Sequence, residues 1–185
     1  KFVYLNGYTT VIVAFAKHLN ANNIVLNAVC KTLKACVVTS EMCFENDKAT
    51  MEKAFGVPVI NEYGASELDI IAFQNKKRQW LVTTESLFVE VLDEKNQPLP
   101  EGETGKLVIT SLHNIAHPFI RYEIGDIGSI VRLDSKHVIL EKLEGRNEDL
   151  VYLPSKKITP GLTFYYITKS VMEDNSNVKE IKVIQ

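Results

Sequence analysis

The sequence lacks the residue groups that build most metal centres and disulfide frameworks. Its 185 residues include three cysteines, Cys30, Cys36 and Cys43, an odd number at spacings that fit neither a disulfide framework nor a C-x-x-C zinc knuckle. The four histidines are scattered, and none stands in an H-E-x-x-H motif. We therefore interpret the cysteines as reduced thiols in the core or near the surface, and we expect no zinc site.

Long apolar runs and an excess of one charge are also missing. The longest apolar stretch near the start, VIVAFA at 11–16, is far too short to span a bilayer, and residues 1–10 lack the regions of a signal peptide. Lys and Arg (21) nearly balance Asp and Glu (23), without the asymmetry that accompanies nucleic-acid or membrane binding. The sequence predicts a cytoplasmic protein with neither of these partners, and it does not specify an oligomeric state.

What is present is an ordinary globular composition, 45% hydrophobic and 24% charged. The first third has the pattern of a parallel sheet: a helix over 8–22, a buried strand at 36–40, a helix over 45–55 that Gly56 ends, and a strand at 57–61. The apolar residues at helical spacing in the first helix are Val11, Ala14, Phe15 and Leu19.

Later residues indicate antiparallel sheet, because short apolar segments alternate with turn clusters. These strand candidates are 68–73, 79–84, 87–93, 105–112, 129–134 and 137–143. From about Gly145 a charged stretch is followed by an apolar segment at 150–154. The sequence then predicts a helix with Thr159 as N-cap and Pro160 at its first position, and a last strand at 180–184. The fold class expected is mixed α/β.

The stretch INEYGASELDI at 60–70 gathers an aromatic ring, a hydroxyl and carboxylates on one predicted bend, Tyr63-Gly64-Ala65-Ser66. Alone, it could be a plain turn after a parallel strand. The functional alternative is a ligand site, since ligands bind beyond the carboxyl ends of such strands. Tyr63 could offer a flat face to a heterocycle, Ser66 a donor to a phosphate oxygen, and Glu67 a carboxylate to Mg²⁺.

A second stretch, PFIRYEIGDIG at 118–128, places Asp126 after Gly125 at a predicted bend between strands. A carboxylate there can accept hydrogen bonds from two adjacent hydroxyls, as in a ribose. The alternative is an ordinary Gly-Asp hairpin turn.

A third stretch, LEGRNEDLVYLP at 143–154, contains Arg146, followed by Glu148 and Asp149. It lies where the pattern of antiparallel strands ends and a different pattern begins. The planar guanidinium of Arg146 has forked N–H donors that suit phosphate or ribose oxygens. A solvated charged loop is the alternative.

Taken together, these motifs closely resemble the motif series of the adenylate-forming superfamily, and within it the branch of phenylacetate–CoA ligases and CapK-like proteins of capsular polysaccharide biosynthesis. Four motifs fall in order: NEYGASE, LPEGETGKLVITSL, RYEIGDIG and GRNEDLVYLP. The resemblance runs from about Asn6 to Pro160. It implies that residues 1–147 are the C-terminal portion of a large adenylation domain and that 148–185 begin a small α+β lid domain.

The resemblance also implies roles for single residues. Tyr63 would pack on adenine, Ser66 would touch the α-phosphate beside Gly64, and Glu67 would help hold Mg²⁺, so that Ser66 and Glu67 are the candidate catalytic residues. Asp126 would bind the ribose hydroxyls.

Further along the chain, the resemblance places Arg146 against the nucleotide. Glu148 would be the hinge between the large domain and the lid. Relatives more often carry Asp at this hinge.

The activity implied is ATP-dependent ligation. A small carboxylic acid attacks ATP to give acyl-AMP and pyrophosphate, and an acceptor, CoA in the ligases, then displaces AMP. Alternatives are a non-CoA acceptor such as a carrier-protein thiol or an amine, a nucleotide-binding module without catalysis, and a structural domain. The acid itself is not specified: the resemblance suggests an aromatic acid, and acylation of an amino sugar or polysaccharide precursor is the alternative.

Departures from the family pattern suggest a piece of a longer enzyme that is inactive alone. The Gly- and Ser/Thr-rich phosphate loop is absent, since GYTT at 7–10 is no substitute. The catalytic lysine has no plausible counterpart, because the sequence stops 25 residues after Pro160 and Lys156 and Lys157 lie in the turn after the hinge. Ile124 stands where relatives often carry Thr. The segment LPSKKI lacks a glycine that gives passage to a pantetheine arm, which weakens the case for CoA.

Overall fold

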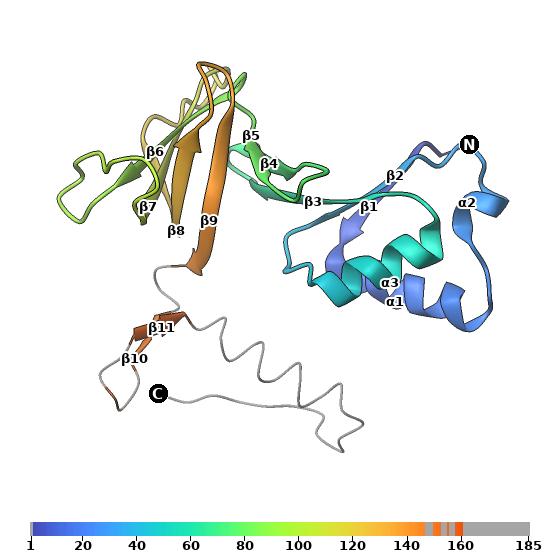
Figure 1. The fold of residues 1–185 in the computed structure, drawn as a ribbon. Helices are drawn as coiled ribbons and strands as arrows, with labels where there is room; N and C mark the ends of the chain where they lie inside the picture. The colour runs from blue at the N-terminus through green and yellow to red at the C-terminus, as the bar shows by residue number, and fades with distance from the viewer. Residues whose placement is uncertain (1, 147–149, 153–154, 156–157, 161–185) are drawn as a thin grey trace. The chain divides into compact units, whose positions relative to one another are not determined.

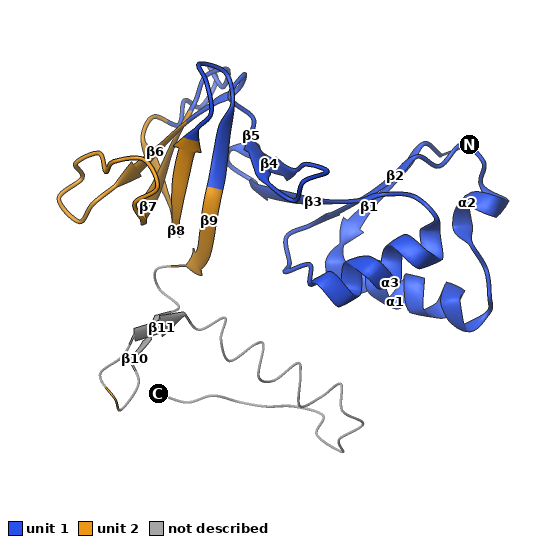
Figure 2. Cartoon of the chain, in the orientation of Figure 1, with its two compact units in different colours: residues 1–88, 111–119, 132–140 blue, residues 89–110, 120–131, 141–185 orange. Residues whose placement is uncertain are grey.

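A computed structural model describes residues 2–146, 150–152, 155 and 158–160 (Figure 1). The chain forms two compact units (Figure 2). The first comprises 1–88, 111–119 and 132–140, and the second 89–110, 120–131 and 141–185. The predicted mixed α/β class is confirmed. The expected boundary between domains 1–147 and 148–185 stays a prediction, because most of 148–185 lies outside the described residues.

The first unit begins with the predicted parallel sheet and its helices. In chain order the elements are β1 (Tyr4–Tyr8), α1 (Thr9–Ala21), α2 (Leu26–Val29), β2 (Ala35–Thr39), α3 (Glu45–Phe55) and β3 (Val59–Ala65). β2 pairs in parallel with β1 and with β3. Cys36 and Val38 on β2 are fully buried, as expected for a central parallel strand.

The helix α1 matches its predicted span, but of the four residues predicted for its apolar face only Leu19 is buried. Ile12, Val13, Ala16 and Leu19 are the apolar residues that it buries. Val11 is 62% exposed and Phe15 38% exposed. Because every residue of VIVAFA is apolar, the sequence pattern cannot select which side of the helix faces the sheet. No helix among the described residues has the length and apolar content needed to cross a membrane.

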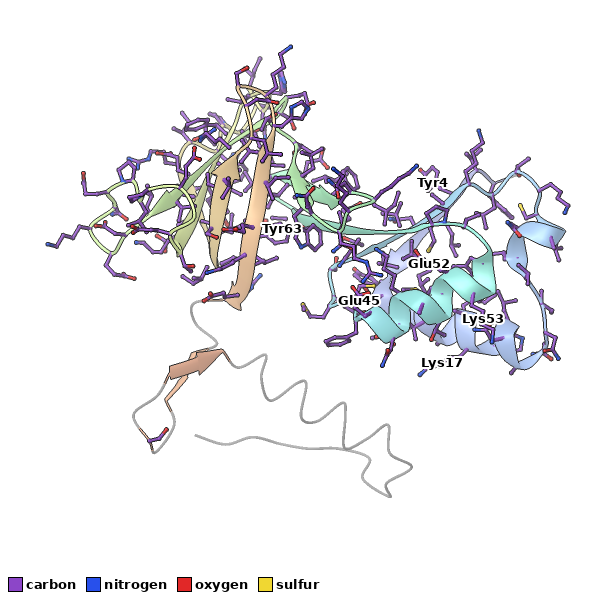
Figure 3. All side chains as sticks on the ribbon, in the orientation of Figure 1. Tyr4, Lys17, Glu45, Glu52, Lys53 and Tyr63 are labelled. Carbon is purple, nitrogen blue, oxygen red and sulfur yellow. The ribbon has the colours of Figure 1, made fainter. Side chains whose placement is uncertain are left out.

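The helix α3 has the bounds that the sequence predicts. Glu45 and Asp47 lie in its first turn and Lys53 in its last, a distribution that favours the helix dipole. Figure 3 shows Glu45 and Lys53 at the two ends of the helix. Gly56 ends it with φ +65° and donates its N–H to the Glu52 carbonyl at 2.9 Å. The core of the first unit lies between these helices and the sheet, with Met51, Ala54 and Phe55 fully buried.

β3 changes partner along its length. Val59 to Asn61 pair in parallel with β2, and Glu62 to Ala65 pair antiparallel with β4 (Asp69–Gln74). The antiparallel part then continues to β5 (Trp80–Val82), which pairs with the start of β9 (Val138–Arg146). The predicted turn is therefore misplaced by three residues. Tyr63 to Ala65 are strand residues, and the turn comprises residues 66–68.

The second unit is antiparallel sheet in the order β9-β8-β7-β6. β6 (Leu87–Leu92) and β9 are shared with the first unit, while β7 is Gly105–Ser111 and β8 is Tyr122–Arg132. The expected bend between strands at Gly125-Asp126 is wrong, since β8 runs through both residues. A bulge takes the place of the bend: Ile124 to Asp126 lie opposite Leu107 alone.

The last described elements are two short antiparallel strands, β10 (Leu150–Tyr152) and β11 (Ile158–Pro160). The predicted helix start at Thr159-Pro160 is wrong, because both residues pair with β10. Thr-Pro is compatible with a helix start and also with the end of an edge strand, where proline needs no donor. Glu148, Lys156 and Lys157 lie outside the described residues, as does the predicted strand at 180–184.

We expect Phe55→Ala to be strongly destabilising. The ring is fully buried and lies 5.9 Å from that of Phe15, so truncation leaves a cavity that costs about 3–5 kcal/mol. Urea denaturation of the protein that contains the chain would measure the loss. Phe88→Ala is the matched control, because Phe88 is 47% exposed beneath Arg132 and should cost below about 1 kcal/mol. Equal losses for both would contradict this account of the core.

The cysteines should differ in reactivity. Burial raises the pKa of the Cys36 thiol to about 12, with a smaller effect from Cys43. A hydrogen bond with the Thr32 hydroxyl, at 3.5 Å, lowers the pKa of Cys30. Because only the thiolate reacts, iodoacetamide at pH 8 should leave Cys36 unmodified in the folded protein and modify it after unfolding, as mass spectrometry of the peptides would show.

The same raised pKa has a consequence for stability. Above pH 9 the thiol of the unfolded chain ionises while Cys36 in the folded protein keeps its proton. The contribution of Cys36 to the free energy of unfolding should therefore fall from pH 9 to about 12. Fast labelling of Cys36 at pH 8 without unfolding would contradict both statements.

Candidate functional site

A pocket of about 690 Å³ lies in the first unit at the carboxyl end of β3. Most of its lining is polar. Its hydroxyl residues are Thr39, Ser40, Ser66, Ser86 and Ser111; its carboxylates are Glu62, Glu67 and Asp69; the remaining members are Gly64, Ala65, Leu68, Ile70, Leu87, His113 and Asn114. The pocket therefore brings together three of the sequence-predicted residues, Gly64, Ser66 and Glu67.

Gly64 is required by the close approach of β4 to β3. A side-chain carbon at Gly64 would lie 2.8 Å from the backbone oxygen of Asp69 and 3.4 Å from the Cα of Ile70. The strands come this close where the register shifts, between Tyr63 and Gly64. The tight turn that follows is closed by the Leu68 N–H, which donates to the Ala65 carbonyl at 3.0 Å. Ser66 and Glu67 are exposed on this turn.

Tyr63 is half-buried on β3 and is not among the residues that line the pocket. Its ring meets that of Trp80 on β5 edge-on, with centroids 6.4 Å apart and an interplanar angle of 72°. Figure 3 shows Tyr63 on the strand that joins the two parts of the sheet. The contact with Trp80 fixes the plane of the tyrosine ring, which is what a stacking platform needs.

The loop after β2 forms another wall of the pocket and was not predicted as part of a site. The Thr39 hydroxyl donates to Glu62 Oε1 at 3.0 Å, and Ser40 has the left-handed φ of +65°. The next residue, Glu41, caps α1: it accepts the Thr10 N–H at 2.7 Å and the Thr10 hydroxyl at 3.1 Å. An apolar strand followed by small polar residues was the available signal.

Another part of the lining comes from the β5–β6 and β7–β8 loops, where the sequence analysis predicted no functional residue. The Leu112 N–H donates to the Ser86 carbonyl at 2.8 Å. His113 Nε2 lies 2.9 Å from the Glu85 carbonyl oxygen, and the Asn114 N–H donates to the Ser111 hydroxyl at 3.3 Å. Residues far apart in the sequence thus form one rim.

Two further predicted residues, Asp126 and Arg146, lie together in the second unit. Arg146 Nε is 4.0 Å from Asp126 Oδ1, and the side chains are 71% and 16% exposed. Such an exposed guanidinium contributes little to stability. Asp126 is the last residue of the β8 bulge and follows Gly125, whose φ is +84°. The bulge turns the Asp126 carboxylate out of the regular alternation of the strand.

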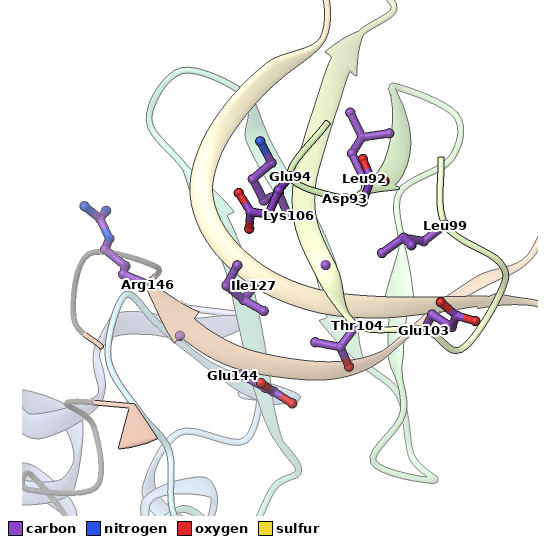
Figure 4. A pocket seen from close by; sticks show the side chains of 12 residues that line it. Leu92, Asp93, Glu94, Leu99, Glu103, Thr104, Lys106, Ile127, Glu144 and Arg146 are labelled. Carbon is purple, nitrogen blue, oxygen red and sulfur yellow. The ribbon is translucent and has the colours of Figure 1, made fainter. Parts of the chain in front are cut away.

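A cavity of about 540 Å³ lies beside Arg146 in the second unit (Figure 4). Lys106 lines it with side-chain exposure of only 11%. The ammonium donates to Asn96 Oδ1 at 3.0 Å and lies 3.6 Å from Glu123 Oε2. Lys106 is thus held by neutral and acidic partners, and the alternating strand pattern gave no sign of its burial.

The donor set around Glu67 suits Mg²⁺ bound together with a phosphorylated ligand. Among the described residues no group of three or more His, Cys, Asp or Glu side chains could hold a metal ion by itself. Mg²⁺ usually takes one or two carboxylates, with phosphate oxygens and waters completing the shell. An exposed carboxylate in a pocket of hydroxyls fits that mode of binding.

Comparison with known proteins identifies relatives of the chain. No family model matches it. Protein CapK of Staphylococcus aureus is 27% identical over 175 residues, which covers 92% of this chain and 37% of CapK. Phenylacetate-coenzyme A ligase of Thermus thermophilus is 30% identical over 138 residues, covering 70% of this chain and 31% of the ligase. The chain thus spans about a third of the length of the curated relatives that it matches.

Solved structures share the fold. An open conformation of 2-hydroxyisobutyryl-CoA ligase in complex with 2-HIB-AMP and CoA has a TM-score of 0.71 at 18% identity, covering 98% of this chain and 44% of that one. At this identity the likeness establishes the fold alone. In sequence the chain is related to CapK and the phenylacetate-coenzyme A ligases, and its fold is that of adenylate-forming CoA ligases.

Proposed function

We propose that the protein containing this chain activates a small carboxylic acid with ATP and transfers the acyl group to an acceptor thiol, with CoA as the acceptor. One observation carries the proposal: the motif residues Gly64, Ser66 and Glu67 share one polar pocket at the carboxyl end of β3, in a chain related to phenylacetate-coenzyme A ligases. The chain alone should be inactive, because it has neither the glycine-rich phosphate loop nor the catalytic lysine of the family.

In the first unit, the proposed roles follow the chemistry of each side chain. Tyr63 offers a ring face to adenine, with its plane held by Trp80. Ser66 donates a hydrogen bond to an α-phosphate oxygen. Glu67 holds Mg²⁺, which when bound neutralises phosphate charge.

In the second unit, Asp126 is proposed to accept hydrogen bonds from the ribose hydroxyls. Its carboxylate is 16% exposed, so each hydrogen bond to it is stronger than one in bulk water. The exposed guanidinium of Arg146 contacts the nucleotide, with planar donors that match phosphate or ribose oxygens. Glu148 is proposed as the hinge for movement of the lid.

The first half-reaction then depends mainly on position. The acid's carboxylate attacks the α-phosphorus, pyrophosphate leaves, and a mixed anhydride with AMP remains. Ser66 orients the phosphate and the pocket holds the acid in line, so that an encounter of two molecules becomes a reaction within one complex. The hydrogen bond from Ser66 stabilises the charge that develops on the phosphate oxygens.

The second half-reaction has two candidate acceptors. The 30% identity to a phenylacetate-coenzyme A ligase favours CoA. The match to CapK over 92% of the chain, together with a segment LPSKKI without the expected glycine, favours a non-CoA acceptor as the second candidate. A thioester product with CoA would decide between them.

Acid-dependent ATP–pyrophosphate exchange is the test of adenylation. We expect the full-length protein to exchange with at least one acid from a panel of aryl and short alkyl acids. Glu67→Ala should lower kcat by about 10²–10³-fold, because phosphate charge is no longer neutralised. Asp126→Ala should raise the KM for ATP by about tenfold, the value of roughly one charged hydrogen bond.

The control for both variants is Glu141→Ala, which removes an exposed carboxylate that lies outside the first-unit pocket. It should leave exchange unchanged. No exchange with any acid, in a protein that still binds AMP, would favour the non-catalytic nucleotide-binding module instead.

The fluorescence of Trp80 should report the nucleotide directly. Trp80 is the single tryptophan of the chain and touches the ring proposed to stack on adenine. AMP binding should therefore change its emission, and Trp80→Phe should abolish that part of the signal. Tyr63→Ala should weaken AMP binding by about 1–2 kcal/mol, roughly 5- to 30-fold in Kd. An AMP titration with unchanged Trp80 emission would argue against adenine at Tyr63.

A further inference from the structure

We propose that Ser86, Ser111 and His113 form a subsite that selects a carboxylic acid bearing a hydroxyl group, with His113 as its specificity-determining residue. The inference rests on the proposed adenylation and adds a substrate class to it. All three residues line the first-unit pocket that also contains Ser66 and Glu67.

Two loops hold these residues in a fixed arrangement. The Leu112 N–H donates to the Ser86 carbonyl at 2.8 Å, and His113 bonds to the Glu85 carbonyl at 2.9 Å. Each loop thus fixes the other through backbone atoms. Side chains anchored in this way lose little entropy when they bind a ligand, which favours discrimination between similar ligands.

The bond to Glu85 also assigns the tautomer of His113. A carbonyl oxygen only accepts hydrogen bonds, so the Nε2 atom, 2.9 Å away, must carry the proton. In the neutral ring, Nδ1 then has a lone pair and accepts. His113 therefore presents to a ligand an acceptor suited to an O–H group.

The two serines complete the pattern. The Ser111 hydroxyl accepts the Asn114 N–H at 3.3 Å, so its own proton can be donated. The Ser86 hydroxyl donates to the Thr83 carbonyl at 3.3 Å, so its oxygen can accept. One donor beside two acceptors is the set that satisfies an alcohol, which both donates and accepts.

The charge of the pocket further narrows the class of carboxylic acid that it would bind. Its described lining includes the carboxylates Glu62, Glu67 and Asp69 and neither Lys nor Arg. A second carboxylate or a phosphate on the acid would be repelled here, because it would lack the neutralisation that Mg²⁺ would give to the phosphates of ATP. A plain alkyl or aryl acid would displace water from Ser111 and His113 without replacing its hydrogen bonds, a mismatch that sites use to reject ligands.

The test compares matched acids in ATP–pyrophosphate exchange by the full-length protein. The pairs are butyrate with 3-hydroxybutyrate and phenylacetate with mandelate, and succinate and 4-aminobutyrate test the charged alternatives. We expect the hydroxylated member of at least one pair to be preferred tenfold or more in kcat/KM. His113→Gln should reduce this preference to below about threefold without raising the KM for ATP, because Gln keeps a donor for Glu85 but has no acceptor at the Nδ1 position.

Three further variants sharpen the result. His117→Gln is the matched control, an exposed histidine of the same loop that does not line the pocket, and it should keep the preference. His113→Asn puts an amide oxygen near the Nδ1 position and should restore part of it. If His113→Gln does not fold, Ser111→Ala replaces it as the test and should reduce the preference in the same way.

The outcomes separate this inference from the proposed function. Exchange with both members of each pair at equal kcat/KM, or a preference for succinate or 4-aminobutyrate, would overturn the hydroxyl subsite and leave adenylation standing. A preference that survives in His113→Gln, or a raised KM for ATP with every acid, would overturn the role of His113. No exchange with any acid would overturn both proposals together.

Discussion

The change of partner within β3 is the constraint on which the first-unit site depends. One strand must pair in parallel with β2 through Val59 to Asn61 and antiparallel with β4 through the next four residues. This is possible only if β4 passes close to the backbone at the junction, and Gly64 permits an approach that a side-chain carbon would block at 2.8 Å. The motif glycine is therefore a packing requirement that also leaves the backbone open to a ligand.

The same junction explains why the pocket is polar. Parallel strands β1 to β3 end at one edge, so the loop after β2 and the turn after β3 meet there. Small polar residues occupy both segments, and Ser40 adopts the left-handed φ of +65°, which bulky and β-branched apolar residues avoid. The site is polar because loops and turns meet at the ends of these strands, as well as because a ligand could bind there.

Much of this could be predicted from the sequence where local patterns decide structure. The bounds of α3 follow from an amphipathic segment closed by Gly56, and the parallel pairing of β2 with β3 follows from two apolar strands around a helix. The buried face of α1 could not be predicted, because an entirely apolar run has no preferred side. The strand at Thr159-Pro160 could not be predicted either, since its pairing with β10 overrides a local helix signal.

The residues of the candidate site also differ in whether the sequence could predict them. Ser66, Glu67, Asp126 and Arg146 stand in contiguous motifs, so residue order alone marked them. In contrast, two loops carry Ser86 and His113, and bonds join these loops: one from His113 to Glu85, 28 residues away, and one from Leu112 to Ser86. The roles proposed for these motif residues concern the nucleotide, which every adenylation shares. The acid differs from one enzyme to the next, so the residues that select it need no common pattern. The residues proposed to select the acid are therefore identified from tertiary contacts and not from a motif. The tautomer of His113, which its bond to Glu85 determines, is one such feature.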